Sequence, residues 1–219
     1  MTFGGDKKFG ESITTKLEKQ LVQATVHLIP RWCETYHLTL LTLVWSLGVV
    51  GFGKLAQSSL SYLWGVNAMV LFQYLTDLYD GAVGRHRNTG LIKWGFFMDH
   101  FLDFLFLCSL CFCGYLITPP ELSHWILILT IVLSGYLIVS FLSFSCTNKF
   151  EIYHFNFGPT EFRAVLILIN TLIIFTGTHH FKYSLPSAVA LLAGGLLIYV
   201  WRTSKTLWQL DMETKLQAV

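Results

Sequence analysis

Charged residues are scarce in this sequence. Asp, Glu, Lys and Arg together make up 13% of its 219 residues, whereas about a quarter is usual for a soluble domain. Hydrophobic residues make up 53%, and the mean hydropathy is +0.55. The net charge of +2 is too small to suggest a nucleic-acid partner. The composition therefore argues against a soluble domain and against nucleic-acid binding.

Two other patterns are missing. The basic N-terminus is not followed by an uninterrupted apolar core and a small-residue cleavage site, so it does not read as a secretory signal peptide. No histidine or acid stands at ligand spacing from Cys108, Cys111 and Cys113. We expect these three thiols to be small packing groups rather than a metal or redox centre.

Long apolar runs are what the sequence has instead. A run of about 20 residues is long enough to cross a bilayer as a helix. Six are predicted, at residues 37–56, 60–83, 93–117, 123–146, 161–179 and 185–203. We therefore expect an all-α membrane protein in which residues 32–219 form one domain of six transmembrane helices.

Residues 1–31 have a different pattern. Basic residues such as Lys16 and Lys19 alternate with apolar residues such as Leu17 and Leu21 at helical spacing. This pattern is typical of an amphipathic helix that lies on the membrane surface. The alternative is an amphipathic helix that docks on the helix bundle.

The distribution of basic residues predicts the orientation. Six spans place both termini on one side, and that side would hold 13 of the 15 basic residues, leaving Lys54 and Lys182 on the other. Cytoplasmic segments carry an excess of Lys and Arg, so the termini are predicted to be cytoplasmic. The 13 residues are Lys7, Lys8, Lys16, Lys19, Arg31, Arg85, Arg87, Lys93, Lys149, Arg163, Arg202, Lys205 and Lys215.

Four aspartates stand near the junction of the second and third spans, at Asp77, Asp80, Asp99 and Asp103. An acid in a hydrocarbon span costs about 2.5–3.5 kcal/mol on insertion scales, so a cation is expected to offset them. Residues three or four apart share a helix face, and a short turn joins the two helices. We expect the four carboxylates to converge on Mg²⁺ or Mn²⁺, which prefer oxygen ligands, with two ions for four acids.

Small residues and a cation accompany these acids. Gly81, Gly84 and Gly95 let helix backbones approach closely and leave room for a ligand. Arg85 is placed to bind a diphosphate. The alternative is structural, with the acids paired to Arg85, Arg87 and Lys93 in an interfacial loop.

These positions resemble the signature of the CDP-alcohol phosphotransferase family, also called CDP-alcohol phosphatidyltransferases, which make phospholipids in membranes. The match comprises the four aspartates with Gly81, Arg85 and Gly95, in the family's order. Gly84 replaces the family's alanine, and the spacer of nine residues from Arg85 to Gly95 is slightly long. Six spans after an N-terminal surface helix also resemble the family's architecture.

The resemblance implies roles for individual residues. Asp77, Asp80, Asp99 and Asp103 would bind the metals, and Asp103 would also be the general base. Asp77, Gly81, Gly84, Arg85 and Gly95 would line the site of the CDP-linked donor. The resemblance also implies an active site open to the cytoplasm, CMP as leaving group, and a homodimer.

The substrates stay open at this level. Asp99-His100 followed by Asp103, and residues 158–163, resemble members that transfer phosphocholine or phosphoethanolamine from a CDP-amino-alcohol to diacylglycerol, and we favour this type slightly. In the alternative, CDP-diacylglycerol reacts with glycerol phosphate, inositol phosphate or serine. Basic residues at cytoplasmic helix ends suit phosphorylated acceptors. The predicted acceptor pocket comprises His100, Lys149, Glu161, Arg163 and Arg202. In the alternative, Lys149, Arg163 and Arg202 are ordinary positive-inside residues and His100 is a polar residue that faces the loop. Glu161 then caps its helix or pairs with Arg163.

Two other classes of function compete with an enzyme. Carboxylates inside a membrane also mark ion paths, so a divalent-cation transporter is one alternative. Its acids should span the depth of the bilayer, whereas here they cluster near one face. The other alternative is a membrane scaffold in which the aspartates have no chemical task.

Overall fold

The computed structural model describes residues 8–9, 15–88, 91–147, 150–151 and 158–217, and nearly all of them are helical. The long helices are α2 (Thr35–Ala56), α3 (Leu63–Arg87), α4 (Ile92–Ile117), α5 (Ser123–Thr147), α6 (Pro159–Thr176) and α7 (Phe181–Gln217). A shorter helix, α1 (Thr15–Thr25), precedes them. Short 3-10 turns occupy Val26–Leu28, Leu60–Tyr62 and Pro120–Leu122. Strands β1 (Lys8–Phe9) and β2 (Phe150–Glu151) pair in parallel.

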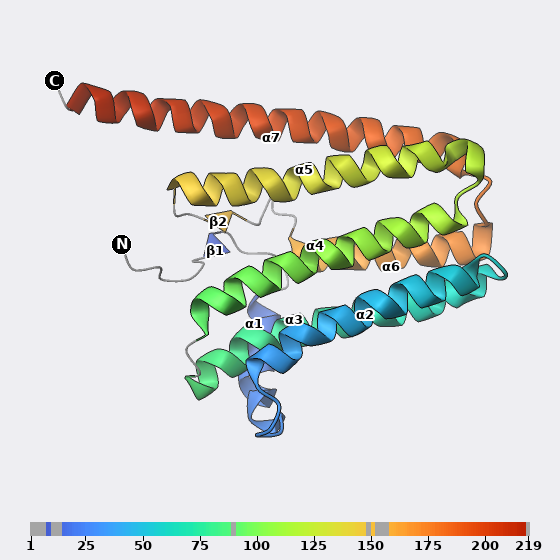
Figure 1. Ribbon diagram of the computed structural model, residues 1–219, viewed down its shortest axis with the longest axis horizontal. Helices are drawn as coiled ribbons and strands as arrows, with labels where there is room; N and C mark the ends of the chain where they lie inside the picture. Colours follow the sequence, from blue (N-terminus) through green and yellow to red (C-terminus); the bar gives the residue numbers. More distant parts are fainter. Residues whose placement is uncertain (1–7, 10–14, 89–90, 148–149, 152–157, 218–219) are drawn as a thin grey trace.

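The long helices run up and down alongside one another (Figure 1). The turns α2–α3, α4–α5 and α6–α7 lie at one end of the bundle. The C-terminal end of α7, the last turns of α3 and the first turns of α4 lie at the other end. The end of α3 and the start of α4, which carry the four aspartates, therefore share one end of the bundle.

The core lies where α2 packs against α3 and α4, with α6 on the other side of α3. Gly53 allows one of the closest approaches, because a Cβ added there would lie 3.0 Å from the Cβ and 3.2 Å from the Cα of Cys113 on α4. Cys113 is only 4% exposed. The expectation that this cysteine is a packing residue is thus consistent with its place in the core.

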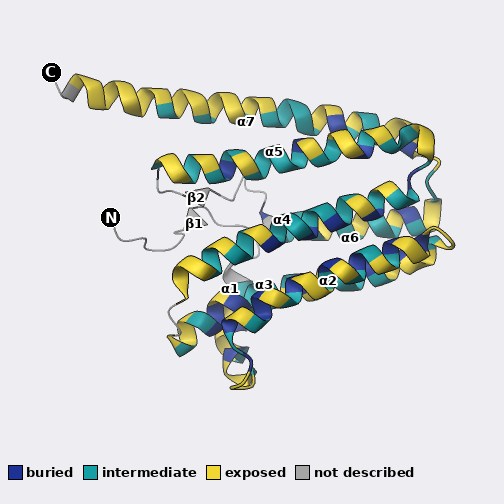
Figure 2. Cartoon of the chain, viewed as in Figure 1, coloured by how far each residue is buried: buried dark blue, intermediate teal, exposed yellow. Residues whose placement is uncertain are grey.

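The outer faces of the bundle are apolar. Ile131 on α5 and Leu191 and Leu197 on α7 each expose more than 70% of their surface, and Figure 2 shows exposed residues along the outer faces of these helices. Soluble proteins rarely expose large contiguous apolar surfaces. Together with the length of the helices, this supports an integral membrane protein.

Four helical segments of the described residues are long and apolar enough to cross a membrane: Thr35–Ala56, Ile92–Ile117, Pro120–Thr147 and Phe181–Leu216. Helices α3 and α6 correspond to the other two predicted spans but are not among these four. The all-helical membrane class is therefore supported, and the count of six spans stays a prediction.

Helix α1 lies against α3. Val22 and Val26 are buried beside Ala82 and Val83, and the Thr25 and Tyr79 hydroxyls share a 2.6 Å hydrogen bond. Leu21, on the same helix, is 51% exposed. The part of residues 1–31 that the structure describes thus includes a helix docked on the bundle, and its position on a membrane surface stays a prediction.

Candidate metal and phosphotransfer site

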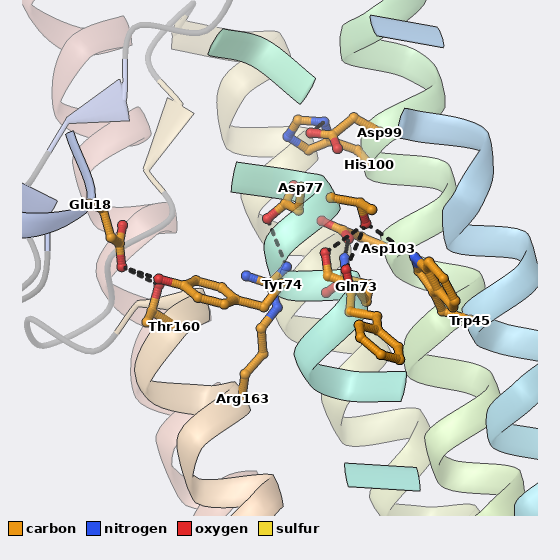
Figure 3. Close-up of polar contacts among 12 residues, drawn as sticks. Glu18, Trp45, Gln73, Tyr74, Asp77, Asp99, His100, Asp103, Thr160 and Arg163 are labelled. Atoms are coloured by element: carbon orange, nitrogen blue, oxygen red, sulfur yellow. Dashed lines mark hydrogen bonds and ion pairs between the residues drawn. The ribbon is translucent and has the colours of Figure 1, made fainter. Parts of the chain in front are cut away.

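Three of the four predicted acids come together. Carboxylate oxygens of Asp77 on α3 and of Asp99 and Asp103 on α4 lie within 4.8 Å of one another, as Figure 3 illustrates. Asp99 and Asp103 are one turn apart on α4, so they share the face that meets α3. All three are partly buried.

Asp80, the fourth predicted acid, contacts α2. It is 8% exposed, and its carboxylate faces α2. The Thr35 hydroxyl shares its single proton between two acceptors, the Asp80 carbonyl oxygen at 2.6 Å and Oδ1 at 2.8 Å. The Thr39 hydroxyl donates to Oδ2 at 2.6 Å. Hydrogen-bonded carboxylate oxygens retain further acceptor capacity, so a role for Asp80 as a metal ligand stays a prediction.

Arg163 reaches the acids from α6. Its Nη2 lies 2.8 Å from Oδ2 of Asp77, and its guanidinium lies 5.7 Å from the centre of the Tyr74 ring. The Arg163 side chain is 11% exposed. In the structural alternative, the acids were expected to form ion pairs with Arg85, Arg87 and Lys93, which flank the α3–α4 connection. In the structure a cation of α6 pairs with Asp77, while Arg87 pairs with Glu34 and donates to backbone carbonyls such as that of Cys33.

Gln73 holds Asp103. Its Nε2 donates to Oδ1 of Asp103 at 2.9 Å, and Gln73 is only 1% exposed. Beside it, the Trp45 indole donates to the Thr76 hydroxyl at 3.2 Å. Gln73 is not among the residues predicted from the sequence, although a polar residue one helical turn before Asp77 in an apolar run is a usable signal.

Glu18 connects α1 to two helices of the site. Its Oε1 accepts hydrogen bonds from the Tyr74 hydroxyl at 3.1 Å and from the Thr160 hydroxyl at 3.0 Å. Tyr74 also stacks near Arg163, so α1, α3 and α6 meet beside the acids (Figure 3). These contacts join residues up to 142 positions apart, and no local sequence pattern indicates them.

The residues predicted to bind the CDP group lie in the last turns of α3 and the first turn of α4. A Cβ added at Gly81 would lie 3.1 Å from Nη1 of Arg85, so the guanidinium folds back over this glycine. A Cβ added at Gly95 would meet no atom within 4 Å. Gly84 accepts the capping N–H of Asn88, which ends α3 in a left-handed conformation. The space beside the backbone is therefore open at Gly95 and occupied by the Arg85 guanidinium at Gly81. Binding of the donor there stays a prediction.

The residues predicted for the acceptor pocket lie in different places. Arg163 meets the acids directly. His100 lies among Phe96 and Phe141, and its Nδ1 is 2.8 Å from the Phe96 carbonyl. Glu161 accepts the Gly158 N–H at 3.0 Å, so its helix-capping role is confirmed. Arg202 is exposed on α7, and Lys149 falls outside the described residues.

The donor atoms fit a hard divalent cation. Three carboxylates from two helices offer only oxygen, which Mg²⁺ and Mn²⁺ prefer. Their mutual repulsion at this spacing favours a bound cation over three neighbouring anions. Such a site, next to a cationic side chain, suits the binding and displacement of phosphate groups.

Comparison with known proteins supports this chemistry. A family model described as CDP-alcohol phosphatidyltransferase matches residues 35–201, a range that contains α2 through α6, all four aspartates and the first part of α7. No curated protein and no solved structure shows significant similarity to this chain.

Proposed function

We propose, from the premise that this chain belongs to the CDP-alcohol phosphatidyltransferase family, that it transfers a phospho-alcohol group from a CDP-linked donor to an acceptor hydroxyl and releases CMP. The family is metal-dependent and carries out phosphotransfer from CDP-alcohols in phospholipid synthesis. The observation that carries the proposal is the meeting of Asp77, Asp99 and Asp103 within 4.8 Å.

We assign metal binding and donor binding to different residues. Asp77, Asp99 and Asp103, with Asp80 beside them, would hold Mg²⁺ or Mn²⁺, as two ions in the proposal. Bound metal supplies charge stabilisation for the diphosphate and for CMP as it leaves. Arg85, whose guanidinium lies over Gly81, would hold the donor next to the acids.

Asp103 would act as the general base. Its carboxylate takes the proton of the acceptor hydroxyl, and the acceptor oxygen forms a bond to the β-phosphorus of the donor. The bond from that phosphorus to the oxygen bridging the two phosphates breaks, and CMP leaves with the bridging oxygen. The hydrogen bond from Gln73 to Asp103 is consistent with a carboxylate held in a fixed orientation.

The donor we favour is a CDP-amino-alcohol, CDP-ethanolamine or CDP-choline, with diacylglycerol as acceptor. This rests on the resemblance of Asp99-His100 and Asp103 to members of that type. A second candidate is CDP-diacylglycerol with a phosphorylated alcohol. The 2.8 Å contact between Arg163 and Asp77 supports this candidate, because it puts a cationic side chain next to the acids, and a guanidinium binds phosphate well.

We also propose a cytoplasmic active site. The C-terminal part of α3 and the N-terminal part of α4, which carry the acids, lie at the same end of the bundle as the C-terminal end of α7 (Figure 1). The sequence predicts 13 basic residues on that side of the membrane and two on the other. This excess supports a cytoplasmic location, where soluble CDP compounds are found. The homodimer implied by the family resemblance stays a prediction.

The experiment is CMP release by the purified chain in detergent with Mg²⁺. CDP-choline and CDP-ethanolamine are offered with diacylglycerol, and CDP-diacylglycerol is offered with inositol phosphate, glycerol phosphate or serine. Asp103→Asn should lower the rate at least about 100-fold, within the range for general-base catalysis. Asp211→Asn, at an exposed position on α7, is the matched control and should retain the rate.

The result distinguishes the classes of function. If the chain releases CMP from one donor, and this activity is lost in Asp103→Asn but kept in Asp211→Asn, the result supports an enzyme and identifies its donor. CMP release that survives Asp103→Asn would refute the assigned base. If the folded protein releases no CMP from any combination, metal flux in liposomes separates a transporter from a scaffold.

A further inference from the structure

We infer that Gln73 is a positioning residue for Asp103, fixing the orientation in which that carboxylate works. The inference rests on the proposed function, in which Asp103 binds metal and accepts the proton. It assigns a role to a residue outside the four-aspartate pattern and outside the glycines and arginine that accompany it.

The geometry joins the two residues directly. Gln73 precedes Asp77 by four residues on α3, so the two share a face of that helix, and its Nε2 reaches Oδ1 of Asp103 on α4 at 2.9 Å. Figure 3 shows Gln73 between the acids and Trp45. Because Gln73 is 1% exposed, bulk water does not compete for this contact.

The chemistry determines which atom of the amide faces the acid. The NH₂ group only donates hydrogen bonds, whereas the amide oxygen would repel a carboxylate oxygen. With Oδ1 held, rotation of the Asp103 carboxylate is restricted, and the direction of Oδ2 is restricted with it. A base and metal ligand needs this kind of preorganisation, since small errors in position lower the rate strongly.

A purely structural role explains the amide poorly. Among the residues that the structure describes, Oε1 of Gln73 has no hydrogen-bond donor, and burying an acceptor without a donor is costly. An apolar side chain of similar length would avoid that cost. Within the part of the chain that the structure describes, the bond to Asp103 is the one that this side-chain amide makes.

Asn67, on the same helix as Gln73, is a buried amide with a structural role. It is 6% exposed, its Nδ2 donates to Thr171 at 3.3 Å, and its Oδ1 accepts from Asn170 at 2.9 Å. Both ends of this amide join α3 to α6, and neither partner is an acid. Asn67→Leu is therefore the matched control, because it removes a buried amide of α3 with no contact to the carboxylates.

The experiment compares Gln73→Met, Gln73→Asn and Asn67→Leu with the wild-type chain. Methionine keeps the length but has no donor, and asparagine keeps the amide but is one methylene too short to reach Asp103. Folding is checked for each by thermal melting in detergent. The measurements are kcat and KM for CMP release, and binding of Mn²⁺ alone by electron paramagnetic resonance.

We expect both Gln73 variants to lower kcat by about 10- to 100-fold, the range for losing a hydrogen bond to a charged group. KM for the donor should change by less than about threefold, because Gln73 bonds to Asp103 and is not one of the residues proposed to bind the donor. Half-saturation by Mn²⁺ should require severalfold more metal. Asn67→Leu should leave kcat and Mn²⁺ binding near wild-type values.

The inference is overturned if neither kcat nor Mn²⁺ binding in the Gln73 variants changes more than in Asn67→Leu. If Gln73→Met does not fold, Gln73→Asn decides. If the wild-type chain releases no CMP at all, the proposed function fails. The Mn²⁺ measurement then decides by itself whether Gln73 positions Asp103.

Discussion

The buried contact between Thr39 and Asp80 allows a quantitative prediction about the packing of α2 on α3. Thr39 is 3% exposed and Asp80 is 8% exposed, and the Thr39 hydroxyl donates to Oδ2 of Asp80 at 2.6 Å. Thr39→Val keeps the shape of the side chain but removes this donor. Oδ1 of the carboxylate then keeps its hydrogen bond from Thr35, but Oδ2 loses the Thr39 donor.

The magnitude follows from the charge on Asp80. A hydrogen bond to a charged group contributes about 1.5–3 kcal/mol and a neutral one about 0.5–1.5 kcal/mol. We therefore expect Thr39→Val to lower the free energy of unfolding by about 1.5–3 kcal/mol in the wild-type background. In an Asp80→Asn background the same change should lower it by only about 0.5–1.5 kcal/mol, which is a coupling of about 1 kcal/mol between the two positions.

The assay is equilibrium unfolding in detergent for the two single variants and the double variant. Ser46→Ala is the control, because the Ser46 hydroxyl is also buried on α2 but donates at 2.8 Å to a carbonyl of its own helix. The reasoning is refuted if Thr39→Val lowers stability equally in both backgrounds. It also fails if Thr39→Val costs no more than Ser46→Ala.

Two further predictions concern other contacts of the bundle. Arg163→Met removes the cation 2.8 Å from Asp77, so it should lower the melting temperature measured in chelator. Added Mg²⁺ should raise the melting temperature of this variant more than that of the wild type, because a metal ion can replace the lost cation. Equal Mg²⁺-induced shifts in the two proteins would contradict this. Gly53→Ala should destabilise the fold by about 1–3 kcal/mol, because the new Cβ meets backbone and side chain of Cys113 at about 3 Å. Gly51→Ala, on the same helix with open space around it, should be neutral or slightly stabilising in the same unfolding measurement.

Much of the fold was predictable because it depends on local composition. The six apolar runs predicted each long helix, and the matched aspartates and glycines predicted the family. Helix ends were less accurate: α7 continues to Gln217, well past the predicted end at residue 203. The polar residues that follow favour a helix without being apolar, so hydropathy marks the apolar part of a helix and not its end.

The sequence by itself determined that Asp77, Asp80, Asp99 and Asp103 lie on two neighbouring helices joined by a short turn. Their spacing is local, and helical geometry converts it into shared faces. Spacing also predicted that Asp99 and Asp103 act together.

Only the tertiary structure decided which neighbour each acid meets. Residues three apart on a helix differ in direction by about 60°, and α3 lies between α2 and α6. Asp77 therefore pairs with Arg163 of α6, while Asp80 accepts hydrogen bonds from Thr35 and Thr39 of α2. The partners stand at least 41 positions away in the chain, and they meet because of helix packing, which local sequence patterns do not encode.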